Sequence, residues 1–531
     1  MCLIRNMSGG GLKFFRLRRV LKGTLVTAAL GGTLYTLHRN EWDVSSIGAV
    51  RIARAAFTVS RIALDYKIST IGIHKDSEEY AEKRSQVHQR SAERLLHLCS
   101  VNGGVYIKVG QHVGALDYLL PPEYTKTLSV LHSRAPASSM EDVLRVLRED
   151  LHAEPSEVFS SISERPIGAA SLAQVHQVTL KETGEKLAVK VQHRRVQPHS
   201  RVDMATMELL VNIVAKVFPE FTLMWLADET KRNLPVELDF IHEGHNTERV
   251  KNMFKHFKWL KVPDVRWDLT SKRVLTMEFC EGGQVNDKEY LTKQNISASQ
   301  VSERLGKLYS EMIFVHGYVH CDPHPGNLLI QPGSDGPTLV LLDHGLYTEL
   351  TNKFRLQYAR LWLALLRADV NTLKVVGGEL GVRGDLYKIL MCIISGRSWT
   401  AVSEGIDKRK TSAKEGQEIR DFASEHFTTI SQILNMVPRE MLLIFKTNDL
   451  LRGIETMLGT RGASKSFMTM SRCCIRAVYD EQLRLCSNMW CKFNVQLRSF
   501  LTGWSLTAYE MYCWMRSTRL ATVLLGCHVA P

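Results

Sequence analysis

The stretch that decides the fold reads His320-Cys321-Asp322-Pro323-His324-Pro325-Gly326-Asn327, and Asp343-His344-Gly345 follows it after an apolar run. Phosphoryl transfer from ATP requires a group that orients the acceptor and oxygen ligands that hold a metal ion on the phosphates. Asp322 is a candidate for the group that orients the acceptor, and Asn327 and Asp343 are candidates for the metal ligands. These residues follow one another in the chain order of a kinase-like fold. We therefore expect an ATP-binding, Mg²⁺-dependent protein of the α+β class, with a bilobal protein-kinase-like fold.

A lysine that could contact the phosphates stands upstream of this stretch. Residues 173–180 and 186–192 alternate like strands on either side of Glu182-Thr183-Gly184-Glu185, which predicts a β-hairpin. Lys190 lies in the second strand, within Leu187-Ala188-Val189-Lys190, where it can reach the phosphates and pair with a helix carboxylate. Alone, Lys190 also fits a solvated strand-end lysine, but three motifs in this order favour the phosphate contact.

Two departures from ordinary protein kinases bear on the substrate. His324 stands where protein-kinase catalytic loops usually carry a lysine, and the surrounding run looks more like the loops of small-molecule phosphotransferases. No Gly-x-Gly-x-x-Gly loop is present, and the corresponding stretch instead holds Gly168, Ala169, Ala170 and Ser171. Alanine restricts the backbone and adds a methyl group where amides would approach phosphates. We expect an altered nucleotide preference or phosphate geometry, the alternative being a plain alanine-rich turn between domains.

Taken together, these motifs resemble the ABC1/aarF (UbiB) atypical kinase-like family over about residues 45–400. Two further signatures of that family are present, because Lys108-Val109-Gly110-Gln111 matches its KxGQ motif and Glu237-Leu238-Asp239 matches its ExD motif. The resemblance implies ATP or ADP and Mg²⁺ as cofactors. It also implies a link to coenzyme Q and membrane-lipid homeostasis.

The resemblance assigns roles to individual residues. It implies that Lys190 contacts the phosphates and pairs with Glu243, beneath the loop that begins at Gly168. Asp322 would be the catalytic aspartate, while Asn327 and Asp343 would hold Mg²⁺. The two family signatures would supply regulatory residues: Glu237 and Asp239 from the ExD motif, and Lys108 and Gln111, which would project into the active site. Lys108 would lie near Glu237.

The pattern of apolar residues and turns predicts five segments. Residues 1–41 resemble a mitochondrial presequence with a possible short membrane anchor, and residues 42–165 predict a helical extension that carries the KxGQ motif. Residues 166–283 and 284–402 are expected to form the N-lobe and the C-lobe. Residues 403–531 read as a linker and a helical C-terminal region that ends in aromatic side chains. Charges interrupt this region too often for a membrane span, which leaves core packing or contact with a membrane surface or a partner.

Charge and cysteine content exclude some functions. Before Glu41 the chain has seven basic residues and no acidic one, so the remainder carries 61 basic against 55 acidic residues and lacks a nucleic-acid footprint. The eleven cysteines form no CxxC pair, which indicates reduced thiols. The uncharged run at residues 23–37 is short for a bilayer span. Four interpretations of the N-terminal segment remain open: a presequence alone, a presequence with an anchor, a secretory signal and a plain basic tail. We expect a mitochondrial, inner-membrane-associated protein.

Three functions are compatible with this sequence. The first is a Mg²⁺-ATP-dependent phosphotransferase or ATPase of mitochondria, acting on a lipid or small-molecule acceptor near the membrane or its proteins. An extension lysine inside the cleft would hinder peptide substrates. The second is a pseudokinase scaffold that binds nucleotide with negligible turnover. The third is a small-molecule kinase of the aminoglycoside or choline kind, against which the extension bearing Lys108 argues.

Overall fold

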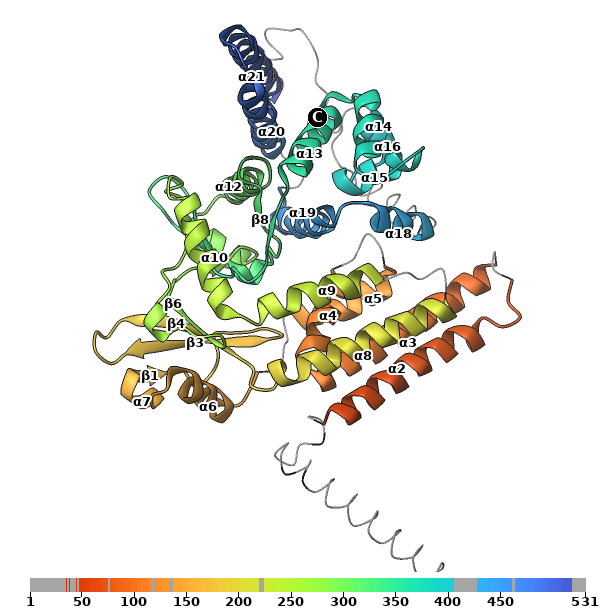
Figure 1. Ribbon diagram of the computed structural model, residues 1–531, viewed down its shortest axis with the longest axis vertical. Helices are drawn as coiled ribbons and strands as arrows, with labels where there is room; N and C mark the ends of the chain where they lie inside the picture. The colour runs from red at the N-terminus through yellow and green to blue at the C-terminus, as the bar shows by residue number, and fades with distance from the viewer. Residues whose placement is uncertain are drawn as a thin grey trace, which may run out of the picture.

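A computed structural model describes Tyr35, His38, Val44 and residues 47–517, apart from 75–76, 116–119, 133–136, 219–223, 405–426 and 461–463. It has two lobes of mixed α and β structure, with a layer of long helices packed beside them (Figure 1). The presequence and most of the linker lie outside the described residues. The α+β, bilobal kinase-like class with helical additions is confirmed by this architecture.

The N-lobe is built on an antiparallel sheet. Its strands are β1 (Phe159–Ile162), β2 (Gly168–Ala169), β3 (Ala173–Leu180), β4 (Lys186–Gln192) and β6 (Val274–Glu278). They run in the order β1-β3-β4-β6, with β2 on β3. The predicted hairpin is confirmed, because β3 and β4 pair along their length.

Helix α6 (Met140–Leu151) covers this sheet, and Ser139 caps it by accepting from Asp142 N. Val143, Val146 and Leu147 of α6 share a core with Phe159 of β1 and with buried residues of β3 and β4. Short α7 (Pro155–Val158) leads into β1. The sheet therefore includes residues that precede the boundary expected at Pro166, because β1 pairs with β3.

The C-lobe brings the ends of several strands together. A mixed sheet has the order β5-β10-β9-β7, formed by β5 (Leu260–Lys261), β7 (Gly283–Gln284), β9 (Leu328–Gln331) and β10 (Thr338–Leu341). A second pair joins β8 (Tyr318–His320) to β11 (Tyr347–Glu349), with Tyr347 opposite His320. Since Asp322 follows β8 and Asp343 follows β10, both aspartates stand at strand ends, as predicted for Asp343.

Helices enclose this sheet in the largest apolar core of the described chain. Helix α12 (Ala298–Ser310) continues as a π-helical turn to His316 and ends at Gly317, whose positive φ of 64° suits glycine. Thr351 caps α13 (Asn352–Arg367) by accepting from Phe354 N at 3.3 Å. The remaining helices are α11 (Lys288–Lys293), α14 (Val370–Glu379), α15 (Leu386–Ser395) and α16 (Trp399–Glu404).

The N-terminal extension is helical from Gly48 onward, as predicted. It contains α2 (Gly48–Ser69), α3 (Glu78–Asn102), α4 (Val105–Gly114), α5 (Pro122–Leu128) and the 3₁₀ turn η2 (Ser129–His132). These helices pack against α8 (Val196–Val217) and α9 (Met224–Glu237) of the N-lobe (Figure 1). A buried ion pair of 2.6 Å between Arg51 and Asp203 joins α2 to α8. A short break separates α9 from the next helix, α10 (Phe240–Met253).

The described part of the C-terminal region contains the helices α18 (Phe427–Met436), α19 (Arg439–Leu458), α20 (Ser464–Leu485) and α21 (Met489–Ser517). Helix α19 runs past the C-lobe toward the extension, while α21 packs on α20 at one end of the molecule (Figure 1). Within the described part of the chain, no helix is both long and apolar enough to cross a membrane. The expectation of reduced thiols is wrong at one place, because Cys486 and Cys491 form a disulfide across the short α20–α21 turn.

Candidate functional site

A cavity of about 3080 Å³ lies between the two lobes, the extension and α19. Its lining includes all but one of the site residues predicted from the sequence, namely Gly168, Ala169, Ala170, Ser171, Lys190, Glu243, Asp322, Asn327, Asp343, Lys108, Gln111 and Glu237. Asp239 is the exception. Residues from the hairpin, the two helices of the N-lobe and the strand ends of the C-lobe therefore meet around one space.

The first cluster in the cavity centres on Lys190. Its Nζ donates to both Glu243 carboxylate oxygens, at 2.7 and 2.9 Å, and to Asp343 Oδ2 at 2.8 Å. Strand β4 presents the lysine, α10 presents Glu243, and the loop after β10 presents Asp343. The predicted pairing of Lys190 with Glu243 is therefore present, and it draws in the candidate metal-binding aspartate as well.

Burial and charge act against each other in this cluster. Burial raises the pKa of Glu243 to about 7, because the desolvation of its carboxylate exceeds the attraction of Lys190. Burial would also raise the pKa of Asp343, but the Lys190 ammonium outweighs it and holds that pKa below its usual range. Burial likewise opposes the charge on Lys190, yet the carboxylates of Asp343 and Glu243 raise its pKa. Near neutral pH the cluster thus contains a charged lysine, a charged aspartate and a glutamate that can take up a proton.

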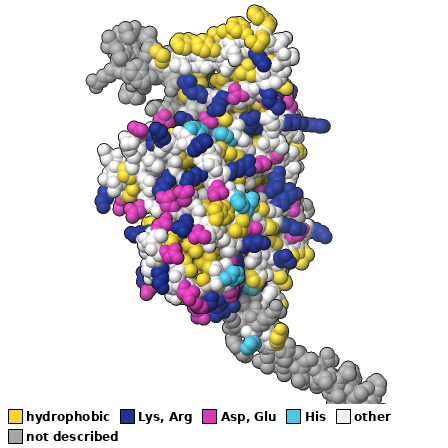
Figure 2. All heavy atoms as spheres, turned by 60° about the vertical axis from the view of Figure 1, so that its left-hand side comes forward, with side chains coloured by type: hydrophobic (Ala, Val, Ile, Leu, Met, Phe, Trp, Pro, Cys, Tyr) yellow, Lys and Arg dark blue, Asp and Glu magenta, His cyan; other side chains and the backbone are white. Residues whose placement is uncertain are grey.

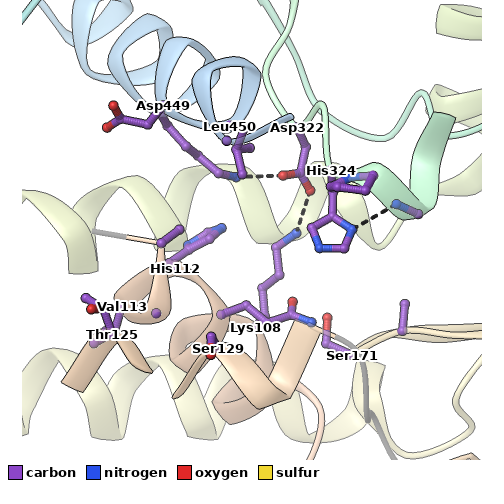
Figure 3. A pocket seen from close by; sticks show the side chains of 18 of the residues that line it. Lys108, His112, Val113, Thr125, Ser129, Ser171, Asp322, His324, Asp449 and Leu450 are labelled. Carbon is purple, nitrogen blue, oxygen red and sulfur yellow. Dashed lines mark hydrogen bonds and ion pairs between the residues drawn. The ribbon is translucent and has the colours of Figure 1, made fainter. Parts of the chain in front are cut away.

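The second cluster surrounds Asp322. Lys108 of α4 makes a 2.8 Å ion pair with Glu237 and lies 3.8 Å from Asp322 Oδ2. Lys446 of α19 approaches the other carboxylate oxygen, Oδ1, at 3.1 Å. Figure 3 shows Asp322 between Lys108 on one side and α19, which carries Asp449 and Leu450, on the other. Cations from the N-terminal extension and from the C-terminal region therefore meet on one aspartate.

These lysines fix the charge of Asp322. Burial would raise the pKa of Asp322, but the charges of Lys446 and Lys108 outweigh it and hold that pKa well below its usual range. Burial would lower the pKa of Lys108, yet Glu237 and Asp322 raise it. The carboxylate thus stays ionised at neutral pH, so it is suited to orienting an acceptor and is a poor proton acceptor.

Oxygen ligands for a divalent metal stand beside these clusters. Asn327 donates its side-chain amide to the carbonyl of Asp322 at 3.1 Å, which leaves its carboxamide oxygen as a ligand. Asp343 Oδ1 accepts from Gly345 N at 3.0 Å. One carboxylate and one carboxamide suit Mg²⁺, which commonly takes few protein ligands together with phosphate oxygens. Among the described residues, no group of three or more His, Cys, Asp or Glu side chains is placed to hold a metal.

Two buried histidines support the loops that carry the aspartates. The ring of His320 pairs with Tyr309 OH at 2.8 Å, and the ring of His344 pairs with Tyr347 OH at 2.9 Å. Burial lowers the pKa of His320 to about 4 and that of His344 to about 3. Both rings are therefore neutral at physiological pH and form part of the core beneath the site.

The alanine-rich loop is a tight turn and not an open glycine flap. Gly168 and Ala169 pair with Val175 and Gln174 of β3, and Ala170 N donates to the carbonyl of Ala173 at 2.8 Å. The Ala170 carbonyl in turn contacts His193 Nε2 at 3.0 Å. These bonds occupy backbone groups of the loop, and the expectation of an altered nucleotide preference or phosphate geometry stays a prediction.

Two of the predicted regulatory residues make hydrogen bonds within the fold. The Gln111 amide donates to the Leu131 carbonyl at 3.0 Å, so this side chain is tied to η2 although it borders the cavity. Asp239 caps α10 by accepting from Ile241 N at 3.1 Å. Gln111 thus borders the cavity as expected, while its amide group is bonded within the extension.

Sequence reasoning missed Lys446. It lies 124 positions beyond Asp322, in a helix that was expected only as part of a general helical region. A lysine on an amphipathic helix has the local pattern of a surface charge, so no motif marks it. Only the path of α19 across the C-lobe places it at the site.

Comparisons with known proteins show which family the sequence resembles. Residues 130–376 match the ABC1 atypical kinase-like domain. "AarF domain-containing protein kinase 1" from Gallus gallus is 50% identical over 511 residues, covering 96% of this chain and 98% of that protein. "AarF domain-containing kinase 1" from Drosophila melanogaster is 48% identical over 469 residues, covering 88% and 90%. Among solved structures, the Rv3197–erythromycin complex from Mycobacterium tuberculosis has 20% identity and a TM-score of 0.44, covering 71% of this chain and 94% of that one.

The similarity to aarF domain-containing protein kinase 1, which the Pro-His-Pro-Gly-Asn run and the overall sequence pattern favour, is confirmed by these relatives. The roles of individual residues stay predictions, although the cavity brings together all the predicted site residues except Asp239. The chain belongs to the ABC1 atypical kinase-like family.

Proposed function

We propose that this protein is a Mg²⁺-dependent phosphotransferase or ATPase of mitochondria that acts on a lipid or small-molecule acceptor and serves membrane-lipid or coenzyme Q homeostasis. The observation that carries the proposal is the contact of Lys190 with both Glu243 and Asp343. In kinase-like sites this lysine binds the α- and β-phosphates and the aspartate binds the metal. Nucleotide phosphates would replace Asp343 as the partner of Lys190, while Asp343 and Asn327 would ligate Mg²⁺.

The acceptor side of the cavity favours a small or extended molecule over a folded peptide. Lys108 projects from α4 to within 3.8 Å of Asp322 and is held there by Glu237. A peptide that lies across the C-lobe would have to displace both this ion pair and α4. The same contact argues against a soluble kinase of the aminoglycoside or choline kind, whose cleft carries no such extension.

The mitochondrial assignment rests on the first 41 residues, in which seven basic residues precede the first acidic one. Inner-membrane association follows from the lipid or coenzyme Q role and is part of the proposal. Imaging the chain with and without residues 1–40 tests it, because unchanged localisation of the shorter chain would contradict a presequence.

Turnover of Mg²⁺-ATP by the purified full chain tests the enzymatic proposal. We expect ADP release that Asp343→Ala and Asp322→Asn each reduce by about 10²-fold or more, because one variant removes a metal ligand and the other the acceptor-orienting charge. Asp385→Asn serves as the matched control, since this carboxylate is 84% exposed. The proposal would be contradicted if ATP turnover were absent, or if it were equal in the wild type and the three variants.

A second function, a nucleotide-binding scaffold, is favoured by the two lysines that hold Asp322. Both carboxylate oxygens are engaged, which would keep turnover low even with nucleotide bound. Rescue of a null phenotype separates the two functions. The double variant Asp322→Asn with Asp343→Ala would rescue if the protein is a scaffold, and would fail to rescue if catalysis is required.

A further inference from the structure

Helix α21 exposes its most apolar face to solvent. Helix α21 packs on α20, and its half-buried residues are small or polar in most cases, namely Cys491, Val495, Ser499, Thr502, Gly503, Leu506 and Thr507. The large apolar side chains lie on the other side, and Trp490 is 71%, Phe500 67% and Trp504 64% exposed. An amphipathic helix on the surface of a globular domain has the opposite arrangement, and among the described residues nothing covers this face.

The exposed face is a continuous stripe. At about 100° per residue, the exposed apolar side chains project into an arc of about 120°, and the half-buried residues occupy an adjoining arc of about 160°. The stripe consists of Met489, Trp490, Phe493, Leu497, Phe500, Leu501, Trp504 and Met511, each at least 43% exposed. Figure 2 shows hydrophobic side chains gathered at the end of the molecule where Figure 1 places α21.

Charges frame the stripe on both sides. Lys492 and Arg498 are exposed, and each projects about 60° beyond one edge of the apolar arc. No acidic residue occurs from Met489 to Tyr509. Long basic side chains at the edges of an apolar face can extend their cations to lipid headgroups while their stems lie along the acyl chains.

We propose that α21 lies flat in the headgroup region of an anionic lipid bilayer, with this stripe immersed and Lys492 and Arg498 contacting lipid phosphates. Helices that bind membranes in this way combine tryptophan, phenylalanine and leucine on one face with basic residues beside them. Tryptophan in particular favours the interface between water and hydrocarbon. The basic edges complement anionic phosphates, which an apolar face of a second copy would not supply.

This surface is independent of the proposed catalysis. Helix α21 contacts α20, and α20 contacts α12 and α13 of the C-lobe, so binding at α21 would fix the orientation of the C-lobe relative to the bilayer. The residues of α21 do not line the nucleotide cavity. Loss of membrane binding should therefore leave nucleotide turnover in solution unchanged.

Vesicle flotation of the full chain tests the inference. With vesicles of phosphatidylcholine and phosphatidylglycerol, we expect Phe500→Ser with Trp504→Ser to lower the bound fraction by about tenfold or more, because two large apolar groups no longer leave water. Lys492→Gln with Arg498→Gln should reduce binding to the level seen on phosphatidylcholine alone. Leu209→Ser with Val375→Ser is the control, since these side chains are 59% and 57% exposed on other helices.

Hydrogen exchange provides a local measurement that binding through the N-terminal segment does not alter. Peptides from residues 489–509 should exchange several-fold more slowly when anionic vesicles are added. Equal flotation of the wild-type and Phe500→Ser/Trp504→Ser chains, or unchanged exchange while the chain floats, would overturn the proposal. A lipid-independent dimer that this double variant converts to a monomer would also overturn it, by assigning the stripe to a second copy.

Discussion

Acidification should destabilise the fold through the histidine that replaces the middle residue of the usual Asp-Phe-Gly motif. Burial lowers the pKa of His344 from its usual 6.5 to about 3. At pH 5 the unfolded chain binds a proton at this ring and the folded chain does not, so stability falls as the pH drops through 6.5. From pH 7 to pH 5 the loss is about 2 kcal/mol, since each pH unit below 6.5 costs about 1.4 kcal/mol.

The substitution His344→Phe isolates this contribution. It loses the hydrogen bond to Tyr347, so its stability at pH 7 will also change, and the informative quantity is the difference between pH 7 and pH 5 within each protein. Other groups contribute equally to both proteins. Among them, burial raises the pKa of Glu243 to about 7, so its carboxyl gains a proton in the folded state and offsets part of the acid loss.

Urea denaturation at pH 7 and pH 5 measures the difference. The loss of unfolding free energy on acidification should be about 2 kcal/mol smaller in His344→Phe than in the wild type. The same substitution at exposed His242 on α10 should leave the loss unchanged. If His344→Phe and wild type lose the same free energy, the ring does not stay neutral in the folded protein and the reasoning is refuted.

Three further predictions concern packing and the site. Arg51→Met leaves Asp203 buried without its cation and should destabilise the protein by about 3–5 kcal/mol, whereas Arg51→Met with Asp203→Leu should cost less in thermal or urea unfolding. Gly110→Ala should cost about 1–3 kcal/mol in the same measurements, because its Cβ would lie 2.5 Å from Leu131 Cδ1. Lys446→Met should release Asp322 Oδ1 and raise ATP turnover by about tenfold. Lys446→Arg keeps the positive charge and should leave ATP turnover unchanged. A fall in ATP turnover in the methionine variant would show that Lys446 assists the reaction.

The sequence predicts those parts of the fold that local pattern determines. The hairpin of β3 and β4 has the predicted limits because alternation and a glycine turn are both present within 20 residues. Strand β1 was not predicted, since four residues are too few for a period to appear and its partner β3 lies beyond an intervening loop. The break between α9 and α10 was also missed, although Asp239 provides a cap signal.

The site likewise contains residues that a sequence motif identifies and residues that no local pattern identifies. Lys190 and Asp343 stand in strands or at strand ends whose chemistry a motif can identify, and the structure brings them to 2.8 Å. Lys446 has no motif, and Gln111 has one but donates its amide within the extension. Glycine in the KxGQ motif has a packing reason, because Cys99 and Leu131 leave no room for a side chain at Gly110. The positions of Lys446 and Gln111 depend on how distant helices pack together, and no local sequence pattern shows this packing.

Equilibrium binding of ATP and ADP to the full chain, with and without Mg²⁺, tests the central claim most directly. If Lys190 and Asp343 form a nucleotide site, calorimetry should show Mg²⁺-dependent ATP binding that Lys190→Met weakens by about tenfold or more. Asp343→Asn should remove the Mg²⁺ dependence, and Lys186→Met, an exposed lysine on the same strand, should bind as the wild type does. Absence of nucleotide binding, or equal affinity in the wild-type and Lys190→Met proteins, would contradict the account.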